Sequence, residues 1–131
     1  MGQLAPRSNE PFHLRWPALN AVGEPFELTL TSPTLIVAVK TDCDGCAAFY
    51  ASALEQFGDL RVVLVAAQYY DASNYYGVQQ EIVTAPELMA ALDIRCPPFY
   101  CLLMGDPLVT AIEGVAFGPE QVAGEIAGAL Q

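Results

Sequence analysis

Two cysteines separated by two residues, Cys43 and Cys46, are the side chains of this sequence best suited to covalent chemistry. They follow the apolar run "TLIVAVK" at 34–40 and precede apolar residues at helical spacing. At a helix N-terminus, the first turn brings two such sulfur atoms together, and the free backbone N–H groups stabilise a thiolate. Cys43 is therefore the candidate nucleophile of a thiol–disulfide exchange, and Cys46 the thiol that resolves the mixed disulfide.

Two carboxylates flank the candidate nucleophile, Asp42 before it and Asp44 after it. Negative charge beside a thiol disfavours the thiolate, so we expect the pKa of Cys43 to rise against the effect of the helix terminus. A less stable thiolate makes a less stable reduced form, which predicts a reducing pair. The alternative interpretation is that both Asp side chains cap the helix and point to water.

The two remaining cysteines open further interpretations. Cys96 is either a third thiol, regulatory or dimer-forming, or a small residue that lines a loop. Cys101 lies in the apolar run 99–104 and is predicted to be a buried packing thiol. A zinc site made by all four cysteines is the alternative, but zinc sites usually consist of two tight pairs. In an extended chain Cys96 and Cys101 would also face opposite ways, so we predict no metal.

The elements around the cysteine pair follow from hydrophobic patterning. Continuous apolar runs at 34–40 and 61–67 are typical of strands buried on both faces of a parallel sheet. A helix that ends at Gly58 is predicted between them, with Cys46, Tyr50, Ala53, Leu54 and Phe57 on one face. The polar, Tyr-rich stretch 68–83 is predicted to be an ordered loop or short helix. A capping box from Thr84 to Glu87 predicts a helix through about Leu92.

The ends of the chain contribute two hairpins and a last helix. Strands at 12–16 and 25–30 form the first hairpin, and strands at 99–104 and 108–113 form the second. The last helix starts at Gly118–Pro119 and presents Val122, Ala123, Ile126, Ala127 and Leu130 on one face. These patterns predict an α/β domain at 12–131 after a flexible tail at 1–11. Its central mixed β-sheet is flanked by helices and extended by an N-terminal β-hairpin.

Composition limits the partners. Fifteen acidic residues against five basic ones give a formal net charge of −10, which repels nucleic acid. No apolar run approaches the roughly 18 residues of a membrane span. The N-terminus lacks the apolar region of a secretory signal, so we expect a cytoplasmic protein, or an exported one if a leader has been removed. The single histidine, His13, is expected at the surface, which excludes Cys–His catalysis.

The second half of the sequence, "TAPELMAALDIRCPPFYCLLMGDPLVTAIEGVAFGPEQVAGEIAGAL", resembles the thioredoxin-fold family. The resemblance covers about 26–131, and the added N-terminal strands are similar to the TlpA-like and peroxiredoxin-like branch. It implies a thioredoxin fold in which Pro98, after Pro97, is the cis-proline facing the dithiol and Gly114 belongs to the adjacent loop. It also implies a thiol–disulfide oxidoreductase that is monomeric or weakly dimeric and has no tightly bound cofactor. Its partners would be protein or peptide disulfides and an unidentified reductant.

The sequence departs from this family at several positions. Thioredoxins carry Trp-Cys-Gly-Pro-Cys, whereas this chain has "DCDGC" at 42–46, and Val37 replaces the buried Asp of thioredoxins. Without that carboxylate, proton transfer to and from Cys46 has no evident protein base. The peroxiredoxin pattern is also missing, since Ile36 and Lys40 stand where Pro and Thr belong. A thioredoxin-like module that binds a partner without turnover is therefore the alternative function.

Tyrosines gather after the second buried strand, at Tyr69, Tyr70, Tyr75 and Tyr76. Because the carboxyl ends of parallel strands meet at one edge of a sheet, this segment is expected on the same edge as Cys43. The hypothesis is an aromatic rim for a protein or peptide substrate, with the cis-proline backbone pairing an extended chain. The alternative is ordinary loop packing by amphipathic tyrosines.

Overall fold

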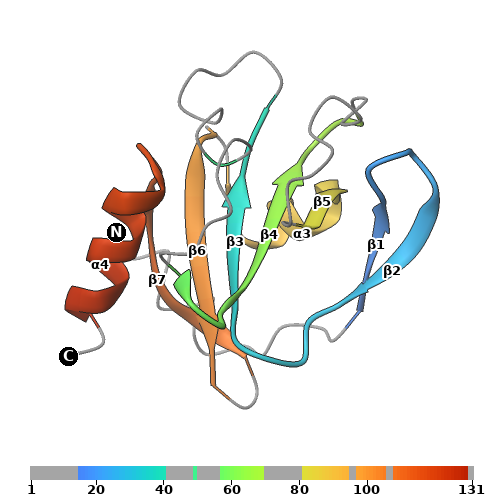
Figure 1. Ribbon diagram of the computed structural model, residues 1–131. Helices are drawn as coiled ribbons and strands as arrows, with labels where there is room; N and C mark the ends of the chain where they lie inside the picture. The colour runs from blue at the N-terminus through green and yellow to red at the C-terminus, as the bar shows by residue number, and fades with distance from the viewer. Residues whose placement is uncertain are drawn as a thin grey trace.

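The computed structural model describes residues 15–40, 49, 57–69, 81–94, 97–105 and 108–129. Its centre is a seven-stranded mixed sheet with the strand order β2-β1-β5-β4-β3-β6-β7 (Figure 1). The strands are β1 (Arg15–Leu19), β2 (Pro25–Thr29), β3 (Thr34–Ala38), β4 (Arg61–Ala66), β5 (Glu81–Thr84), β6 (Phe99–Met104) and β7 (Val109–Val115). The helices described in full are α3 (Pro86–Ala91) and α4 (Pro119–Ala129). The predicted α/β class and the mixed sheet with an N-terminal hairpin are confirmed.

Strand β3 lies between β4 and β6 and is buried on both faces of the sheet. It runs parallel to β4 and antiparallel to β6. Ile36 and Ala38 belong to a core shared with β1 and α3, whereas Leu35, Val37 and Val39 belong to a core shared with α4. Each buried Val or Leu side chain contributes roughly 1.5–3 kcal/mol to this packing. Burial on two faces explains why the run shows no polar alternation.

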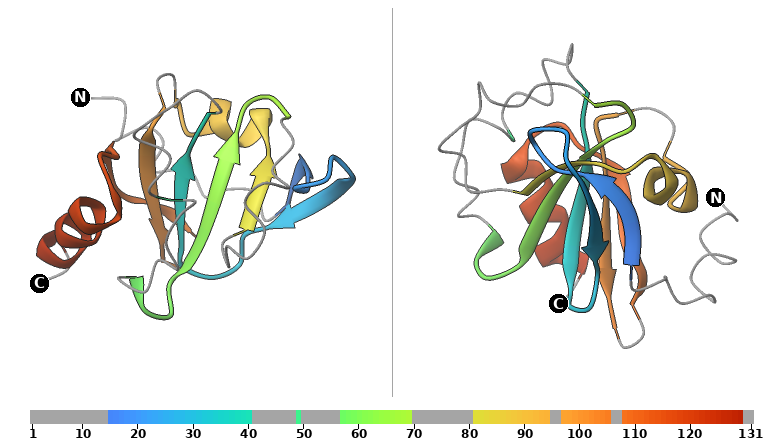
Figure 2. Two further views of the ribbon diagram at one scale, coloured as in Figure 1. Left: turned by 45° about the horizontal axis from the view of Figure 1, so that its top comes forward. Right: turned by 90° about the vertical axis from the view of Figure 1, so that its right-hand side faces the viewer.

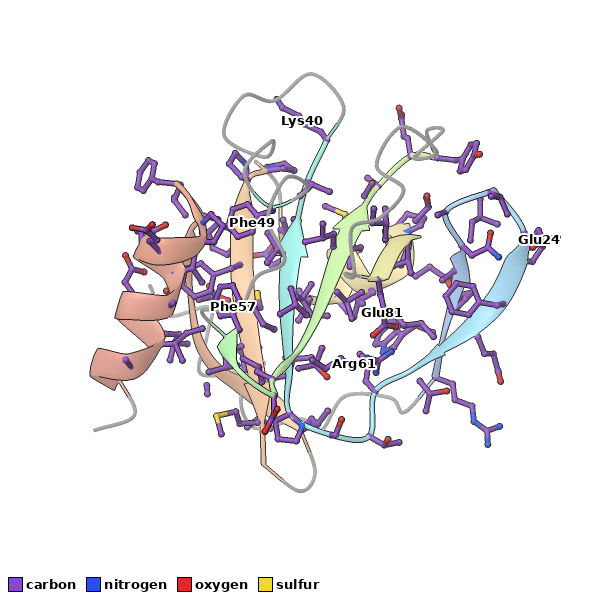
Figure 3. All side chains as sticks on the ribbon, in the orientation of Figure 1. Glu24, Lys40, Phe49, Phe57, Arg61 and Glu81 are labelled. Carbon is purple, nitrogen blue, oxygen red and sulfur yellow. The ribbon has the colours of Figure 1, made fainter. Side chains whose placement is uncertain are left out.

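The two cores make the molecule three layers thick. Figure 2 shows α3 and α4 on opposite faces of the sheet. Phe49, which is helical, and Phe57 are both buried on the α4 side of β3 (Figure 3). Gly58 follows with φ of +59°, the left-handed conformation predicted for the end of a helix. The rest of the predicted helix, 46–48 and 50–56, lies outside the described residues.

Strand β5 corrects the prediction of a loop or short helix at 68–83. Four residues pair in parallel with β4, and only Ile82 and Val83 among them are apolar. Two apolar residues are too few to define a period, so pairing with β4 decides the structure. The predicted capping box is also wrong, because Thr84 ends β5. Ala85 occupies the N-cap of α3 without a side-chain cap hydrogen bond.

Strand β1 extends beyond the predicted end of the first hairpin strand. The prediction ended this strand at Trp16, yet β1 includes Pro17 and continues to Leu19. Pairing with β5 is confined to Leu19 and Thr84, so no ladder bond to β5 is needed at Pro17. The predicted strand start at 12–14 lies outside the described residues.

The C-terminal elements follow the prediction closely. The β6–β7 hairpin forms, and β7 continues two residues past the predicted end, through Gly114 and Val115. In α4 the side chains of Val122 and Ile126 are buried, but Ala127 is exposed, contrary to prediction. Consecutive helical residues are about 100° apart, so Ala127 lies beside the face that Val122 and Ile126 define. Leu130 lies outside the described residues.

One ion pair ties the amino ends of β4 and β5 to the end of β2. The Arg61 guanidinium donates two hydrogen bonds to the Glu81 carboxylate, at 2.6 and 2.8 Å, and a third to the Thr29 carbonyl at 2.6 Å. Figure 3 shows this pair far from Lys40, which follows β3.

In the part of the chain that the structure describes, no helix has the length and apolar character needed to cross a membrane.

Candidate functional site

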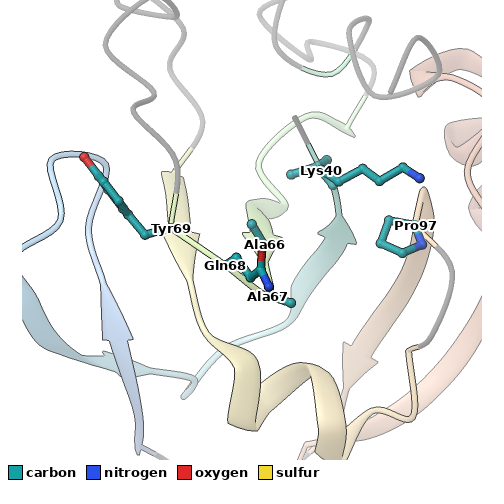
Figure 4. Close-up of a pocket in the computed structure, with 7 residues that line it drawn as sticks. Lys40, Ala66, Ala67, Gln68, Tyr69 and Pro97 are labelled. Carbon is teal, nitrogen blue, oxygen red and sulfur yellow. The ribbon is translucent and has the colours of Figure 1, made fainter. Parts of the chain in front are cut away.

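A pocket lies at the carboxyl ends of β3 and β4, and residues that follow these two strands line it. Its volume is about 350 Å³, and it is lined by Val39, Lys40, Ala66, Ala67, Gln68, Tyr69 and Pro97 (Figure 4). The Val39 N–H donates to the Val65 carbonyl at 2.9 Å, which holds the start of this edge in register. Open α/β sheets bind ligands at this edge, because the carboxyl ends of the strands leave a crevice.

The segment that leads into β6 closes one side of the pocket. The peptide bond between Pro97 and Pro98 is cis. The Pro98 carbonyl accepts a hydrogen bond from the Ala116 N–H at 3.1 Å, so the connection from β7 to α4 lies against this proline. Phe117 follows directly and is 75% exposed. An apolar side chain is thus presented next to the Pro97–Pro98 segment.

Gly114 lies inside β7, opposite Tyr100 of β6, rather than in a loop as the resemblance implies. A Cβ atom at this position would stand 3.3 Å from the Tyr100 ring. This contact is tighter than most Cβ contacts, so the glycine allows the Tyr100 ring to lie against the β7 backbone.

A hydrogen-bonded chain of side chains supports the β7–α4 connection. The buried Tyr100 ring carries a hydroxyl that donates to the Glu125 carboxylate at 2.5 Å. The Gln121 amide donates to the same carboxylate at 2.7 Å and to the Val115 carbonyl at 3.0 Å. Its oxygen accepts from the Phe117 N–H at 2.7 Å. The network therefore joins β6, the connection and α4.

The network shifts the titration of both of its ionisable groups. The hydrogen bond from Tyr100 lowers the pKa of Glu125 below its ordinary value, and the bond from Gln121 acts the same way. Burial raises the pKa of Tyr100 well above its ordinary range, and the bond to Glu125 adds to this. Hydrogen bonds to a carboxylate favour its ionised form. The network is therefore most stable with Glu125 charged and Tyr100 neutral.

Replacing Tyr100 by Phe is expected to raise the pKa of Glu125 toward its ordinary value, because the largest cause of the shift is removed. Since the folded pKa is depressed, the stability that Glu125 contributes is present above its unfolded pKa. It is lost as the pH falls through the folded value. NMR titration of the Glu125 side chain measures the shift. Tyr69→Phe is the matched control and should leave the Glu125 pKa unchanged; identical titration in the wild type and Tyr100→Phe would contradict the prediction.

Comparisons with solved structures identify the architecture. The chain is similar to a secreted Mycobacterium tuberculosis disulfide oxidoreductase homologous to Escherichia coli DsbE, with 15% identity and a TM-score of 0.66 over 88% of this chain and 96% of that one. A thio-disulfide isomerase from Thermus thermophilus matches at 17% identity and 0.58, over 92% and 94%. StoA from Bacillus subtilis matches at 14% identity and 0.57, over 81% and 92%. The chain has the thioredoxin fold. No protein-family model matches the sequence, and comparison with curated proteins gives no match.

The thioredoxin fold brings together only part of the predicted site within the described residues. Pro97 and Tyr69 line one pocket. Pro98 follows Pro97 and accepts a hydrogen bond from Ala116, and Gly114 lies in β7 opposite Tyr100. The remaining predicted site residues are Asp42, Cys43, Cys46, Tyr70 and Cys96, and all five lie outside the described residues.

Tyr69 lies on the predicted edge of the thioredoxin fold and is 44% exposed. Its ring also packs on the β1–β2 turn, where Gly23 has φ of +88° and a Cβ would stand 3.2 Å from the ring. A second groove, of about 490 Å³, lies beyond Tyr69 and includes Phe26 and Glu87. Tyr69 therefore both lines the pocket and packs on the hairpin, which fits the substrate rim and the packing interpretation equally.

Two further predicted positions lie in the cores of the thioredoxin fold. Cys101 is fully buried, with its sulfur 3.8 Å from a Glu113 carboxylate oxygen, so the prediction of a packing thiol is confirmed. Val37 is also fully buried, between Leu64 and Tyr100 on the neighbouring strands. Among the described residues, no three His, Cys, Asp or Glu side chains gather as a metal site would require.

Sequence reasoning missed Lys40, Gln68 and Phe117 as candidate site residues. Lys40 could have been found from its place directly after a buried strand, since such positions lie at the binding edge of a parallel sheet. Gln68 carries no comparable signal. Phe117 lies beside Pro98 only because of the bond from Ala116, which links segments remote in sequence.

Proposed function

We propose that the chain is a thiol–disulfide oxidoreductase that acts on protein or peptide disulfides. The observation that carries the proposal is the pocket shared by Lys40 and Pro97. Cys43 follows Lys40 by three residues, a stretch that spans at most about 11 Å. We infer that this short connection keeps Cys43 close to the pocket edge that carries the cis Pro97–Pro98 segment. The fold shared with disulfide oxidoreductases supports this assignment.

The reaction assigns one role to each thiol. The Cys43 thiolate attacks one sulfur of the substrate disulfide, which forms a mixed disulfide and releases the other substrate sulfur as a thiolate. The Cys46 thiolate then attacks the Cys43 sulfur, which closes the Cys43–Cys46 disulfide and releases the second substrate thiolate. Two electrons pass from the protein to the substrate, and protons from solvent neutralise the released thiolates. An external thiol or dithiol restores the reduced pair.

The surface around Pro98 suits an extended polypeptide. Val115 ends β7 and is 47% exposed, and Phe117 lies on the connection that Pro98 holds and is 75% exposed. Exposed apolar side chains beside a backbone segment provide affinity for a peptide. Asp42, Tyr69 and Tyr70 would border this surface, and Cys96 would lie next to it as an auxiliary thiol. We infer substrates larger than a free thiol.

The flanking carboxylates set the expected direction of electron flow. Asp42 and Asp44 oppose a negative charge on Cys43, which favours oxidation of the pair and reduction of the substrate. The second candidate is a partner-binding module without turnover. It is favoured by the fully buried Val37, which leaves that position without the carboxylate of thioredoxins.

Reduction of insulin by dithiothreitol separates the two functions. We expect the wild-type protein to accelerate the reaction over a protein-free blank, and a binding module to leave it at the blank rate. Equilibration of the protein with glutathione redox buffers then measures its reduction potential. A value below about −200 mV agrees with a reducing pair, whereas one near −120 mV indicates an oxidant.

A further inference from the structure

The positive charges of the described residues are unevenly placed. Lys40 is the only lysine in the sequence, and the chain has four arginines. Two of these arginines are described, and both lie at the end of the sheet opposite the pocket. Arg61 pairs in register with Thr34, at the start of β3, and Arg15 pairs with Thr29, whose carbonyl accepts from Arg61. Among the described residues, Lys40 is therefore the only Lys or Arg at the pocket edge.

Neither of the two described arginines can provide positive charge in the pocket. The Arg61 charge is engaged by the Glu81 carboxylate through two hydrogen bonds. Arg15 is exposed at the start of β1, outside the pocket lining. An anionic group in the pocket would thus meet the positive charge of Lys40.

Lys40 is exposed and lies where a substrate would pass. Figure 4 shows its ammonium group extended toward Pro97, across the pocket from Gln68 and Tyr69. Among the described residues of the lining, Lys40 is accompanied by an amide, a phenol and apolar side chains, and by no carboxylate. These described side chains do not repel a carboxylate.

We propose that Lys40 selects disulfide substrates that carry a carboxylate next to the reacting cysteine. This inference rests on the proposed oxidoreductase function and names its substrate class, acidic peptide disulfides. Bound at Pro97 and Pro98, a peptide would place the residue beside its cysteine over the pocket, within reach of the ammonium group. The attraction counters the repulsion that a chain of net charge −10 exerts on an acidic peptide.

The expected size of the preference is modest because Lys40 is exposed. Exposed ion pairs favour the paired state by a factor of about five at most. Salt screens such pairs over about 10 Å at 0.1 M ionic strength, so the preference should decline as salt is added. A preference that persists in concentrated salt would indicate a contact other than charge.

The test uses three short peptide disulfides that differ only in the residues flanking cysteine, which are Asp, Asn or Lys. The kcat/KM of the wild-type protein, measured with dithiothreitol as reductant, should be roughly three- to fivefold higher for the Asp peptide than for the Asn peptide at low salt. Lys40→Glu should reverse the order and favour the Lys peptide. Lys40→Arg should retain the wild-type order because it keeps the charge.

Arg15→Glu is the matched control. It makes the same change as Lys40→Glu, from −10 to −12 in net charge, but at the opposite end of the sheet. It should lower rates for the Asp peptide only slightly and keep the wild-type order.

The outcomes separate the inference from the function on which it rests. Equal rates for the Asp and Asn peptides would overturn the role of Lys40 while the oxidoreductase function stood. A uniform change for all three peptides in Lys40→Glu would also overturn it, because Lys40 would then act on the protein's own thiols or carboxylates. Absence of exchange with every peptide in the wild type would overturn the oxidoreductase function, and the selection with it.

Discussion

Replacing Cys46 by Ser is expected to stop the reaction at the mixed disulfide. Cys43 can still attack the substrate, but a serine hydroxyl cannot displace the bound sulfur, so the covalent complex persists. Turnover should fall by at least about a hundredfold, because residues that act as one catalytic unit lose most of the rate when either is removed. Mass spectrometry under non-reducing conditions measures the adduct, with stoichiometric peptide disulfide and no external thiol.

Two further serine variants make this result specific. Cys43→Ser should show neither turnover nor adduct, because the attacking thiol is missing and Cys46 is assigned only to resolution of the mixed disulfide. Cys96→Ser is the matched control and should retain turnover, since the proposed cycle does not use this thiol. Wild-type turnover in Cys46→Ser, or an adduct on Cys96 in place of Cys43, would contradict the assigned roles.

Replacing Val37 by Asp, the residue type of thioredoxins, is expected to destabilise the fold strongly. Val37 is fully buried between Leu64 and Tyr100, where no described residue provides a positive partner. An uncompensated buried charge costs about 3–5 kcal/mol, a large share of the roughly 5–15 kcal/mol that stabilises a typical domain. Chemical denaturation at neutral pH measures the loss, and a loss below about 1 kcal/mol would contradict the burial argument.

The pH dependence of Val37→Asp distinguishes charge from size. Burial raises the folded pKa of the new carboxyl above its unfolded value of about 3.9. The unfolded chain then releases its proton first, so the variant loses about 1.4 kcal/mol per pH unit between the two values. Below the unfolded value the charge penalty disappears. Val37→Thr has a similar shape and no charge, and its penalty of about 1–3 kcal/mol should not vary with pH.

Local hydrophobic patterns predicted the elements in which the spacing of apolar residues shows which side chains are buried. The run at 34–40 lacks alternation because both faces of β3 are covered, and this is visible without knowing what covers them. Val122 and Ile126 mark the buried face of α4 by spacing alone. The left-handed Gly58 and the buried Cys101 were predicted for the same reason, since each depends on its immediate sequence context.

Elements that depend on a remote partner were predicted poorly. Strand β5 carries too few apolar residues to show a period, and it is a strand because β4 lies beside it. Pro17 belongs to β1 because the pairing of β1 with β5 is limited to Leu19. The residues near Pro17 in the sequence do not reveal this limit. Thr84 pairs in a sheet instead of capping a helix for the same reason. In each case a neighbour far away in sequence overrode the local preference.

The sequence by itself determined the two-sided burial of the central strands, and its CxxC spacing predicted the class of chemistry that we propose. Only the tertiary structure decided which groups surround the candidate site. Lys40 and Pro97 line one pocket because β3 and β6 are neighbours in the sheet. Ala116 meets Pro98 through one backbone hydrogen bond. The physical reason is that periodicity reports whether a residue is buried, whereas the partner of each strand is set by packing the whole chain.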